Sequence, residues 1–236
     1  MSEISEKSAE PFATARLPLY HGPLVKVRIQ DTCEYEISKA LLCAESPVFT
    51  AMFEGSFLEA QEQAVDLELM EGVISKRSVE ALFQWLYLRV VKFDIEDPRE
   101  HIWAAIELAR LADRYGITGI ESQTAEYINE IIVDNPDPDY ELDPGELAYN
   151  QNFLLREEHI ISGILLHYGH PVRRALANSC VADFLEHCPH KFADTAREYP
   201  EFAADLLHEV SLALDILRWY PGIDLGSLPP PITHGI

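Results

Sequence analysis

Cysteine and histidine side chains gather in the last third of the chain, and both residue types can bind zinc. Cys180 precedes the run His187-Cys188-Pro189-His190, and His167 and His170 lie upstream. Structural zinc sites usually pair their ligands as C-x2-C and H-x3-H, and these paired spacings are missing here. Cys180 also falls on an apolar helix face, where a thiol packs well without a metal. We therefore expect no metal and no cofactor.

A catalytic role has no more support in the sequence than a metal site has. A Cys188 nucleophile with His187 as its base is disfavoured, because neighbouring side chains in one element point apart. The motifs of nucleotide-binding loops, serine hydrolases and zinc proteases are absent, and His208-Glu209-Val210-Ser211-Leu212 lacks the second histidine of a zinc protease. The acidic stretch 134–146 lacks the ligand spacing and the glycine of an EF-hand loop and fits a solvated linker instead of a calcium site. The sequence therefore predicts a protein that is not an enzyme.

The composition disfavours further classes of function. Asp and Glu number 40 against 18 Lys and Arg, a formal net charge of −22 over 236 residues, and such a surface repels phosphate backbones and anionic lipids. No run of about 18 apolar residues is present to span a bilayer, and MSEISEKSAEP at the N-terminus does not have the pattern of a signal peptide. The four scattered cysteines do not suggest a disulfide framework. We expect an intracellular protein, cytoplasmic or nuclear, that binds neither nucleic acid nor membranes.

The elements of the first half can be read from periodicity. Apolar and polar residues alternate over 24–30 and over 34–38, on either side of Asp31-Thr32-Cys33, which predicts a β-hairpin, and 64–69 alternates again as a short strand. Helices are expected at 40–44, from Ser46-Pro47 to Gly55, over 79–87, from Asp97-Pro98 to Gly116, and after a capping box at Thr118-Gly119-Ile120-Glu121. With few strands, all placed early, the fold class is α+β.

The last third of the chain reads as helical. Three apolar stripes have helical spacing: Ile160, Ile161, Ile164, Leu165 and Tyr168; Val172, Ala175, Leu176, Ser179 and Cys180; and Phe202, Leu206, Val210, Leu214 and Leu217.

The stretch Ser46 to Glu59 raises a separate question. Ser46 suits the N-cap of a helix with Pro47 at its first position, and Phe49, Met52 and Phe53 share one face that predicts a core contact. The aromatic residue Phe57 comes after the stop at Gly55. From the residues alone it either folds back on the core or is held out for another protein.

Five short motifs follow one another in the first half of the chain: Lys39-Ala40-Leu41-Leu42-Cys43, Ser46-Pro47-Val48-Phe49, Met52-Phe53-Glu54-Gly55, Phe57-Leu58-Glu59 and Trp85-Leu86-Tyr87. In this order and spacing, from about Leu24 to Val133, they resemble the BTB (POZ) domain, in particular the BTB proteins abundant in filamentous fungi. The resemblance implies a cluster of helices flanked by short strands. It also implies protein–protein association, by homodimerisation and, in many members, by recruitment of a cullin as the substrate adaptor of a ubiquitin ligase.

The resemblance assigns roles to particular residues. Members that bind cullins carry a hydrophobic-x-Glu motif just after the helix that follows Ser-Pro-x-Phe, which here is Phe57-Leu58-Glu59. The aromatic ring is expected to fill a groove on the cullin while the Glu59 carboxylate organises the loop. Met52 and Phe53 are expected to support this surface from the core side.

Two departures from the family pattern bear on dimerisation. Ser38 stands where the family has a histidine before the lysine, and Leu24 and Val25 stand where an acid is usual. That acid and the following basic residue line a charged pocket at the interface of dimeric members. Lys39 is retained and is the candidate dimer-interface residue.

The expected organisation has five parts: a lead-in over 1–23, a BTB/POZ domain over 24–133, an acidic, Pro-rich linker over 134–152, a helical region over 153–220 and a Pro-rich tail over 221–236. Two functions stay open. The chain is either a protein-interaction module that acts as a cullin adaptor, with the C-terminal helices or a dimer partner choosing the client, or a homo-oligomerising scaffold or regulatory module without a link to a ligase.

Overall fold

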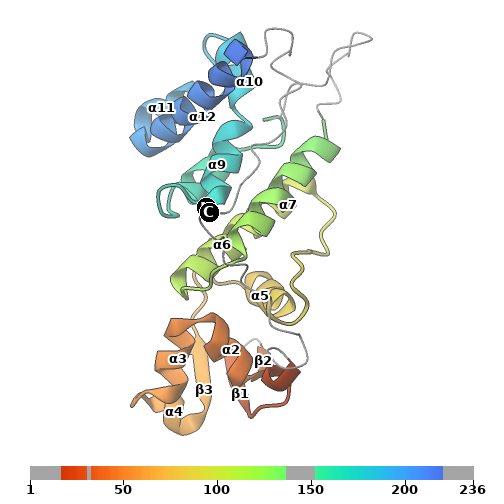
Figure 1. Ribbon diagram of the computed structural model, residues 1–236, viewed down its shortest axis with the longest axis vertical. Helices are drawn as coiled ribbons and strands as arrows, with labels where there is room; N and C mark the ends of the chain where they lie inside the picture. Colours follow the sequence, from red (N-terminus) through yellow and green to blue (C-terminus); the bar gives the residue numbers. More distant parts are fainter. Residues whose placement is uncertain (1–16, 31–32, 137–151, 220–236) are drawn as a thin grey trace, which may run out of the picture. The chain divides into compact units, whose positions relative to one another are not determined.

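The structure is a computed structural model that describes residues 17–30, 33–136 and 152–219. The expected turn at Asp31-Thr32, most of the acidic linker and the Pro-rich tail lie outside the described residues. The chain divides into two compact units, which are described separately (Figure 1). The first unit holds residues up to Leu69 together with Tyr115–Ile117, and the second holds Met70–Arg114 and the residues from Thr118 onward.

The first unit is built on a three-stranded sheet in the order β2-β1-β3. Strand β1 (Leu24–Ile29) pairs antiparallel with β2 (Cys33–Ser38), with Val27 opposite Tyr35, and parallel with β3 (Ala64–Leu67). Val25, Val27 and Ile29 are fully buried, so the alternating pattern of the sequence marks the inner face of the sheet. The hairpin, the third strand and the α+β class are confirmed.

The outer face of the sheet is held by charged pairs between strands. The Glu34 carboxylate on β2 accepts hydrogen bonds from Lys26 Nζ at 2.8 Å and from Arg28 Nε at 2.9 Å, both on β1. These two hydrogen bonds lower the pKa of Glu34. Arg28 also reaches Asp66 on β3, at 3.4 Å, so one guanidinium connects all three strands.

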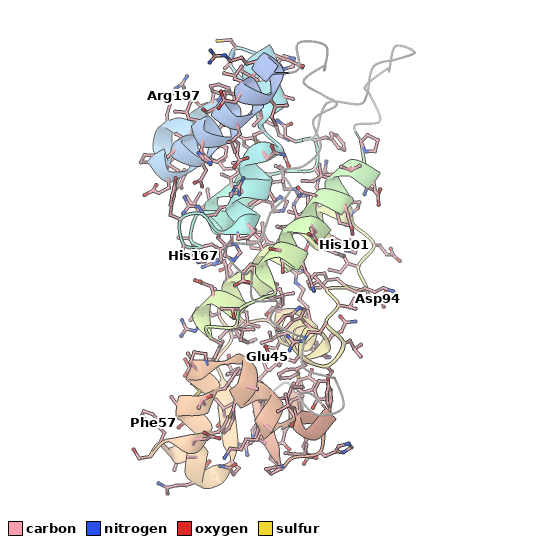
Figure 2. All side chains as sticks on the ribbon, viewed as in Figure 1. Glu45, Phe57, Asp94, His101, His167 and Arg197 are labelled. Carbon is pink, nitrogen blue, oxygen red and sulfur yellow. The ribbon has the colours of Figure 1, made fainter. Side chains whose placement is uncertain are left out.

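Four short helical segments complete the first unit: a 3-10 helix η1 (Leu17–Tyr20), α2 (Lys39–Glu45), α3 (Pro47–Glu54) and α4 (Leu58–Glu62). The predicted N-cap is confirmed, because Ser46 Oγ accepts a hydrogen bond from the Phe49 N–H at 3.1 Å. Phe57 stands between α3 and α4, and its side chain points away from the ribbon (Figure 2).

The second unit is mainly helical in the described residues, with one isolated β-bridge between Met70 and Ile74. Its helices are α5 (Lys76–Leu88), α6 (Pro98–Arg114), α7 (Glu121–Asp134), α8 (Glu157–Gly163), α9 (Pro171–Asn178), α10 (Val181–Glu186), α11 (Ala193–Glu198) and α12 (Pro200–Trp219). Helices α5, α7 and α8 pack on α6, α9 packs on α7 and α8, and α12 packs on α9. The C-terminal helices therefore continue the core that α6 and α7 begin. None of the helices in the described part of the chain combines the length and apolar character needed to cross a membrane.

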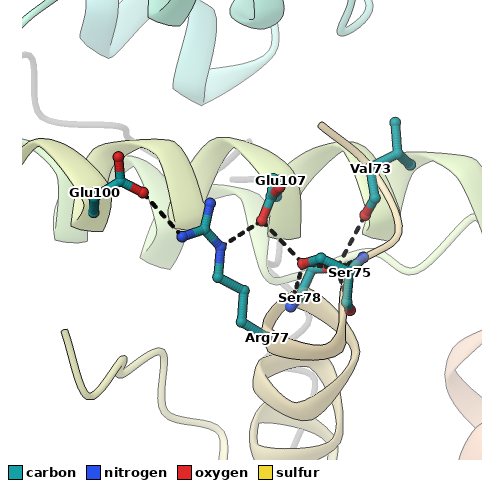
Figure 3. Close-up of polar contacts among 6 residues, drawn as sticks. All are labelled: Val73, Ser75, Arg77, Ser78, Glu100 and Glu107. Carbon is teal, nitrogen blue, oxygen red and sulfur yellow. Dashed lines mark hydrogen bonds and ion pairs between the residues drawn. The ribbon is translucent and has the colours of Figure 1, made fainter. Parts of the chain in front are cut away.

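A buried carboxylate joins the start of α5 to α6 (Figure 3). Glu107 of α6 is only 5% exposed and accepts hydrogen bonds from Arg77 Nε at 2.7 Å and from Ser75 Oγ at 3.0 Å. Arg77 also donates to Glu100 at 3.1 Å, and Ser75 forms a reciprocal capping box with Ser78. A buried charge requires such donors, so these contacts fix where α5 begins.

Three local predictions were wrong. Thr118 does not cap α7, because the N-cap is Ile120, whose side chain is fully buried. The Glu121 carboxylate instead accepts a hydrogen bond from the Gly119 N–H. On α12 the apolar stripe passes from Val210 to Ala213, and Leu214 is 50% exposed. The side chain of Leu217 lies outside the described residues.

The third wrong prediction is the stripe that runs to Tyr168. Helix α8 ends at Gly163, and Leu165 and Tyr168 are 62% and 73% exposed while Leu166 is buried. A Cβ atom at Gly163 would lie 2.5 Å from Leu176 Cδ1, so α9 packs directly against the α8 backbone. The chain leaves α8 in a tighter turn, with the Leu166 N–H bonded to the Gly163 carbonyl, which changes the face that points inward.

Two ion pairs attach α12 to α9. Arg173 and Asp205 are 6% and 7% exposed and lie 2.8 Å apart, and Arg173 also donates to the Leu166 carbonyl at 3.0 Å. Arg174 Nε lies 2.9 Å from Glu209 Oε1, and the Glu209 side chain is 2% exposed.

We predict that Arg173→Ala lowers the free energy of unfolding by about 3–5 kcal/mol, because it leaves the Asp205 carboxylate buried without its cation. Urea unfolding followed by circular dichroism measures the change. Arg197→Ala is the control: its pair with Asp194 is exposed, so a change below about 1 kcal/mol is expected. Equal effects of the two substitutions would contradict the role of the Arg173 pair.

Two buried histidines serve as helix caps in their neutral form. His159 Nδ1 accepts the Arg156 N–H at the start of α8, and His170 Nδ1 accepts the Val172 N–H at the start of α9, each at 3.1 Å. Burial lowers the pKa of both imidazoles from 6.5 to about 4, assisted by the charge of Arg156 and by His167 respectively. Both pKa values are thus lower in the folded than in the unfolded chain.

From this we predict that the free energy of unfolding rises with pH between about 4 and 6.5 on account of these histidines, since the unfolded chain binds more protons there. The stabilisation is complete above that window and is lost as the pH falls through it. His170→Asn keeps a capping side chain that does not titrate, so its unfolding free energy should fall less on acidification. His208→Asn, at an exposed position, should behave as wild type, and an unchanged pH profile for His170→Asn would refute the assignment.

Candidate protein-interaction surface

The candidate surface is formed by the end of α3, the turn at Gly55 and α4. Its inner side is a stack of aromatic rings. The Phe49 ring lies 4.6 Å from that of Tyr115, nearly parallel, and 6.1 Å from that of Phe53. Phe49 and Phe53 are each 1% exposed, and Met52 is half-buried. Phe53 therefore lies beneath the surface, and Met52 is the member of this pair that reaches solvent. Their role in supporting a contact stays a prediction.

The turn at Gly55 lets the chain pass close to the end of α3. A Cβ atom at Gly55 would lie 2.3 Å from the Ala51 carbonyl oxygen and 3.2 Å from a ring carbon of Phe57. The glycine ends the helix as predicted, but its φ of −80° is not left-handed. Close approach is thus the reason that a glycine is needed here.

Phe57 and Leu58 are large apolar side chains that the fold leaves in solvent. They are 57% and 63% exposed, and Phe57 occupies the N-cap position of α4 without making a side-chain cap. The ring does not fold back into the core, which was one of the two alternatives left by the sequence. Phe57 at the N-cap and Leu58 at the first position of α4 thus place two large apolar side chains next to each other in the chain and in solvent.

Glu59 lies in the first turn of α4 and is half-buried. A negative charge at this place is favourable, because the first turn of a helix has unpaired N–H groups. In the part of the chain that the structure describes, the Glu59 carboxylate accepts no hydrogen bond. Its expected role in organising the loop stays a prediction.

Lys39 fixes the end of α3. Its Nζ donates a hydrogen bond of 2.9 Å to the Phe53 carbonyl, one of the carbonyls that the end of a helix leaves without an intrahelical partner. Gln63 Nε2 reaches the same carbonyl at 3.5 Å. The ammonium group of Lys39 is therefore used within the chain, and its proposed place in a dimer interface stays untested. No sequence pattern pointed to Gln63, since its role depends on a left-handed backbone at the end of α4.

Ser38, which replaces the histidine usual in the resembling family, has a local role. It is fully buried, its Oγ accepts the Leu41 N–H at 3.3 Å as the N-cap of α2, and it donates to the Leu19 carbonyl. The sequence identified Ser38 only as a departure from the family pattern. In the structure it caps α2 and also holds η1.

The cysteines and histidines considered at the outset are placed apart or used otherwise. Cys180 is fully buried, its thiol donates to the Leu176 carbonyl, and burial raises its pKa. His187 Nδ1 lies 3.0 Å from Asp183 Oδ1, and Cys188 is exposed. Across residues 17–30, 33–136 and 152–219, no three His, Cys, Asp or Glu side chains come together as ligands for a metal ion.

Comparison with known proteins agrees with this architecture. The family model of the BTB/POZ domain matches residues 25–132. No curated protein matches the chain. BTB/POZ domains are protein–protein interaction modules. Residues 25–132, with their small sheet and surrounding helices, are a BTB/POZ domain, and the chain continues beyond them as a mostly helical region.

Proposed function

We propose that the protein is a substrate adaptor of a cullin-based ubiquitin ligase and that Phe57, Leu58 and Glu59 contact the cullin. The observation that supports this most is the exposure of Phe57 and Leu58, 57% and 63%, on a segment whose neighbours are fixed. A few buried aromatic and aliphatic side chains usually carry most of the free energy of an interface. A ring that already stands out from the surface can enter a groove on a partner without rearrangement.

The surroundings of the segment favour a preformed contact. Lys39 and Gln63 hold the end of α3 through the Phe53 carbonyl, and Gly55 permits the close turn that follows. The apolar pair is thus presented by an ordered backbone, which reduces the entropy lost on binding. Met52 extends the apolar area beside it, and Phe53 supports it from the core.

We predict that wild-type protein is captured by an immobilised cullin and that Phe57→Ala with Glu59→Ala weakens capture by roughly thirtyfold, which corresponds to losing about 2 kcal/mol at a hot spot. The matched control is Leu207→Ala, because Leu207 is 58% exposed but lies on α12. Titration pull-downs with a panel of cullins measure the affinity. Absence of capture by wild type, or capture indifferent to the paired substitution, would refute the adaptor function.

A homo-oligomerising scaffold is the second candidate. It is favoured by Leu24, an apolar residue at the start of β1 that is 53% exposed. In the family that the chain resembles, the residue at this position lies at the dimer interface, and a leucine there would pack against a second copy of the chain.

If Leu24 forms such a contact, light scattering should give twice the chain mass of 26.7 kDa for wild type, and Leu24→Lys should restore the mass of a monomer. Leu69→Lys, at a position 49% exposed in the same unit, should leave the dimer unchanged. A monomer at all concentrations would count against the homo-oligomerising scaffold and would have no bearing on cullin capture.

A further inference from the structure

A groove of about 460 Å³ lies within the second unit and is lined by residues of α6, of the segment that leads into α8, and of α11. It combines basic side chains with aromatic rings. Arg99, Arg156 and Lys191 line it, as do Phe153 and the largely buried Phe192. Three of the 18 basic side chains of a strongly acidic protein therefore meet in one place.

Two of these basic residues keep their charge available. Arg99 is half-buried, with its guanidinium carbon 5.3 Å from the centre of the Phe153 ring, and Arg156 is exposed. Among the described residues neither guanidinium has a carboxylate partner. An arginine placed over an aromatic ring is partly ordered and can form two parallel hydrogen bonds with a carboxylate.

Lys191 has a different task. Its ammonium group donates to the backbone carbonyls of Asn152 at 2.7 Å, Leu155 at 2.9 Å and Phe153 at 3.3 Å. These bonds hold the wall of the groove that carries Phe153. The lysine thus positions the aromatic ring.

The two acidic residues of the groove, Glu157 and Asp194, form no ion pair with Arg99 or Arg156. Glu157 accepts a hydrogen bond from Thr195 Oγ1 at 3.3 Å, and Asp194 pairs with Arg197 three residues along α11. Their negative charge makes the groove unsuited to a densely charged polyanion, as does the overall charge of −22. A ligand with an isolated carboxylate and a neighbouring apolar group fits better.

We propose that this groove binds a short acidic segment of another protein, with an Asp or Glu carboxylate between Arg99 and Arg156 and an aromatic or aliphatic side chain against Phe153. This inference goes beyond cullin binding and does not depend on it, because the groove and the Phe57 surface share no residue. In an adaptor, such a groove selects the client.

The test is selection of a phage-displayed library of random short peptides on the full chain. Selected peptides should be enriched in Asp and Glu next to aromatic or aliphatic residues. Fluorescence anisotropy of the labelled peptides should show affinity reduced by about tenfold or more for Arg99→Gln with Arg156→Gln, as expected when a carboxylate loses its charged donors. Arg99→Lys with Arg156→Lys keeps the positive charges but removes the planar guanidinium groups that can donate two parallel hydrogen bonds to a carboxylate. This variant should show an intermediate loss of affinity.

The matched control is Arg114→Gln with Arg218→Gln, which changes the net charge equally at exposed positions outside the groove. This control should bind the peptides as wild type does. The proposal is overturned if the selected peptides are no richer in acids than the unselected library, or if the groove and control variants lose affinity alike. No cullin enters this experiment, so its failure is separate from failure of the adaptor function.

Discussion

A helix that is packed on several sides can contain a carboxylate only if its neighbours supply hydrogen bonds, and α6 meets this constraint at Glu107. Alanines at four of the nine buried positions of α6 let α5, α7 and α8 approach it closely. Ser75 and Arg77 then bring the start of α5 to the one buried charge on this helix. The hydrogen bonds of Glu107 therefore decide the register of α5 on α6, while the apolar residues of α6 supply most of the burial. Helices α7 and α8 also pack on α6, and α9 and α12 extend the unit from there.

Local signals in the sequence predicted most elements of the fold. Alternation over the first strands, the Ser46-Pro47 helix start and the 3.6-residue spacing in α5 and α9 depend on neighbours in the chain, and all were correct. The errors have tertiary causes. Thr118 lost the cap position because Ile120 had to be buried, and the α8 stripe stopped because Leu176 packs against Gly163. No property of either segment alone could have revealed these contacts.

The candidate surface was predictable only in part for the same reason. Periodicity identified Phe49 and Phe53 as core residues, and both are buried. For Phe57 the pattern allowed a ring folded back on the core or a ring held in solvent, and the structure has it in solvent. The roles of Lys39, Gln63 and Ser38 depend on backbone carbonyls and N–H groups brought close by the fold. Arg99 and Arg156 stand far apart in the sequence, and only the packing of α8 on α6 places them in one groove.

The side chain of Arg173 has a consequence for how the chain can be divided. Its guanidinium donates to carbonyls in the turn after α8, to the Glu201 carbonyl and to the Asp205 carboxylate of α12. A truncated chain that ended before α12 would lose the Asp205 carboxylate and the Glu201 carbonyl, and the Arg173 guanidinium would keep only the two carbonyls of the turn after α8. The turn after α8, α9 and α12 thus share the hydrogen bonds of one buried cation, and removing α12 would break this set. Expression boundaries for the helical region should therefore retain α12 whenever α9 is present.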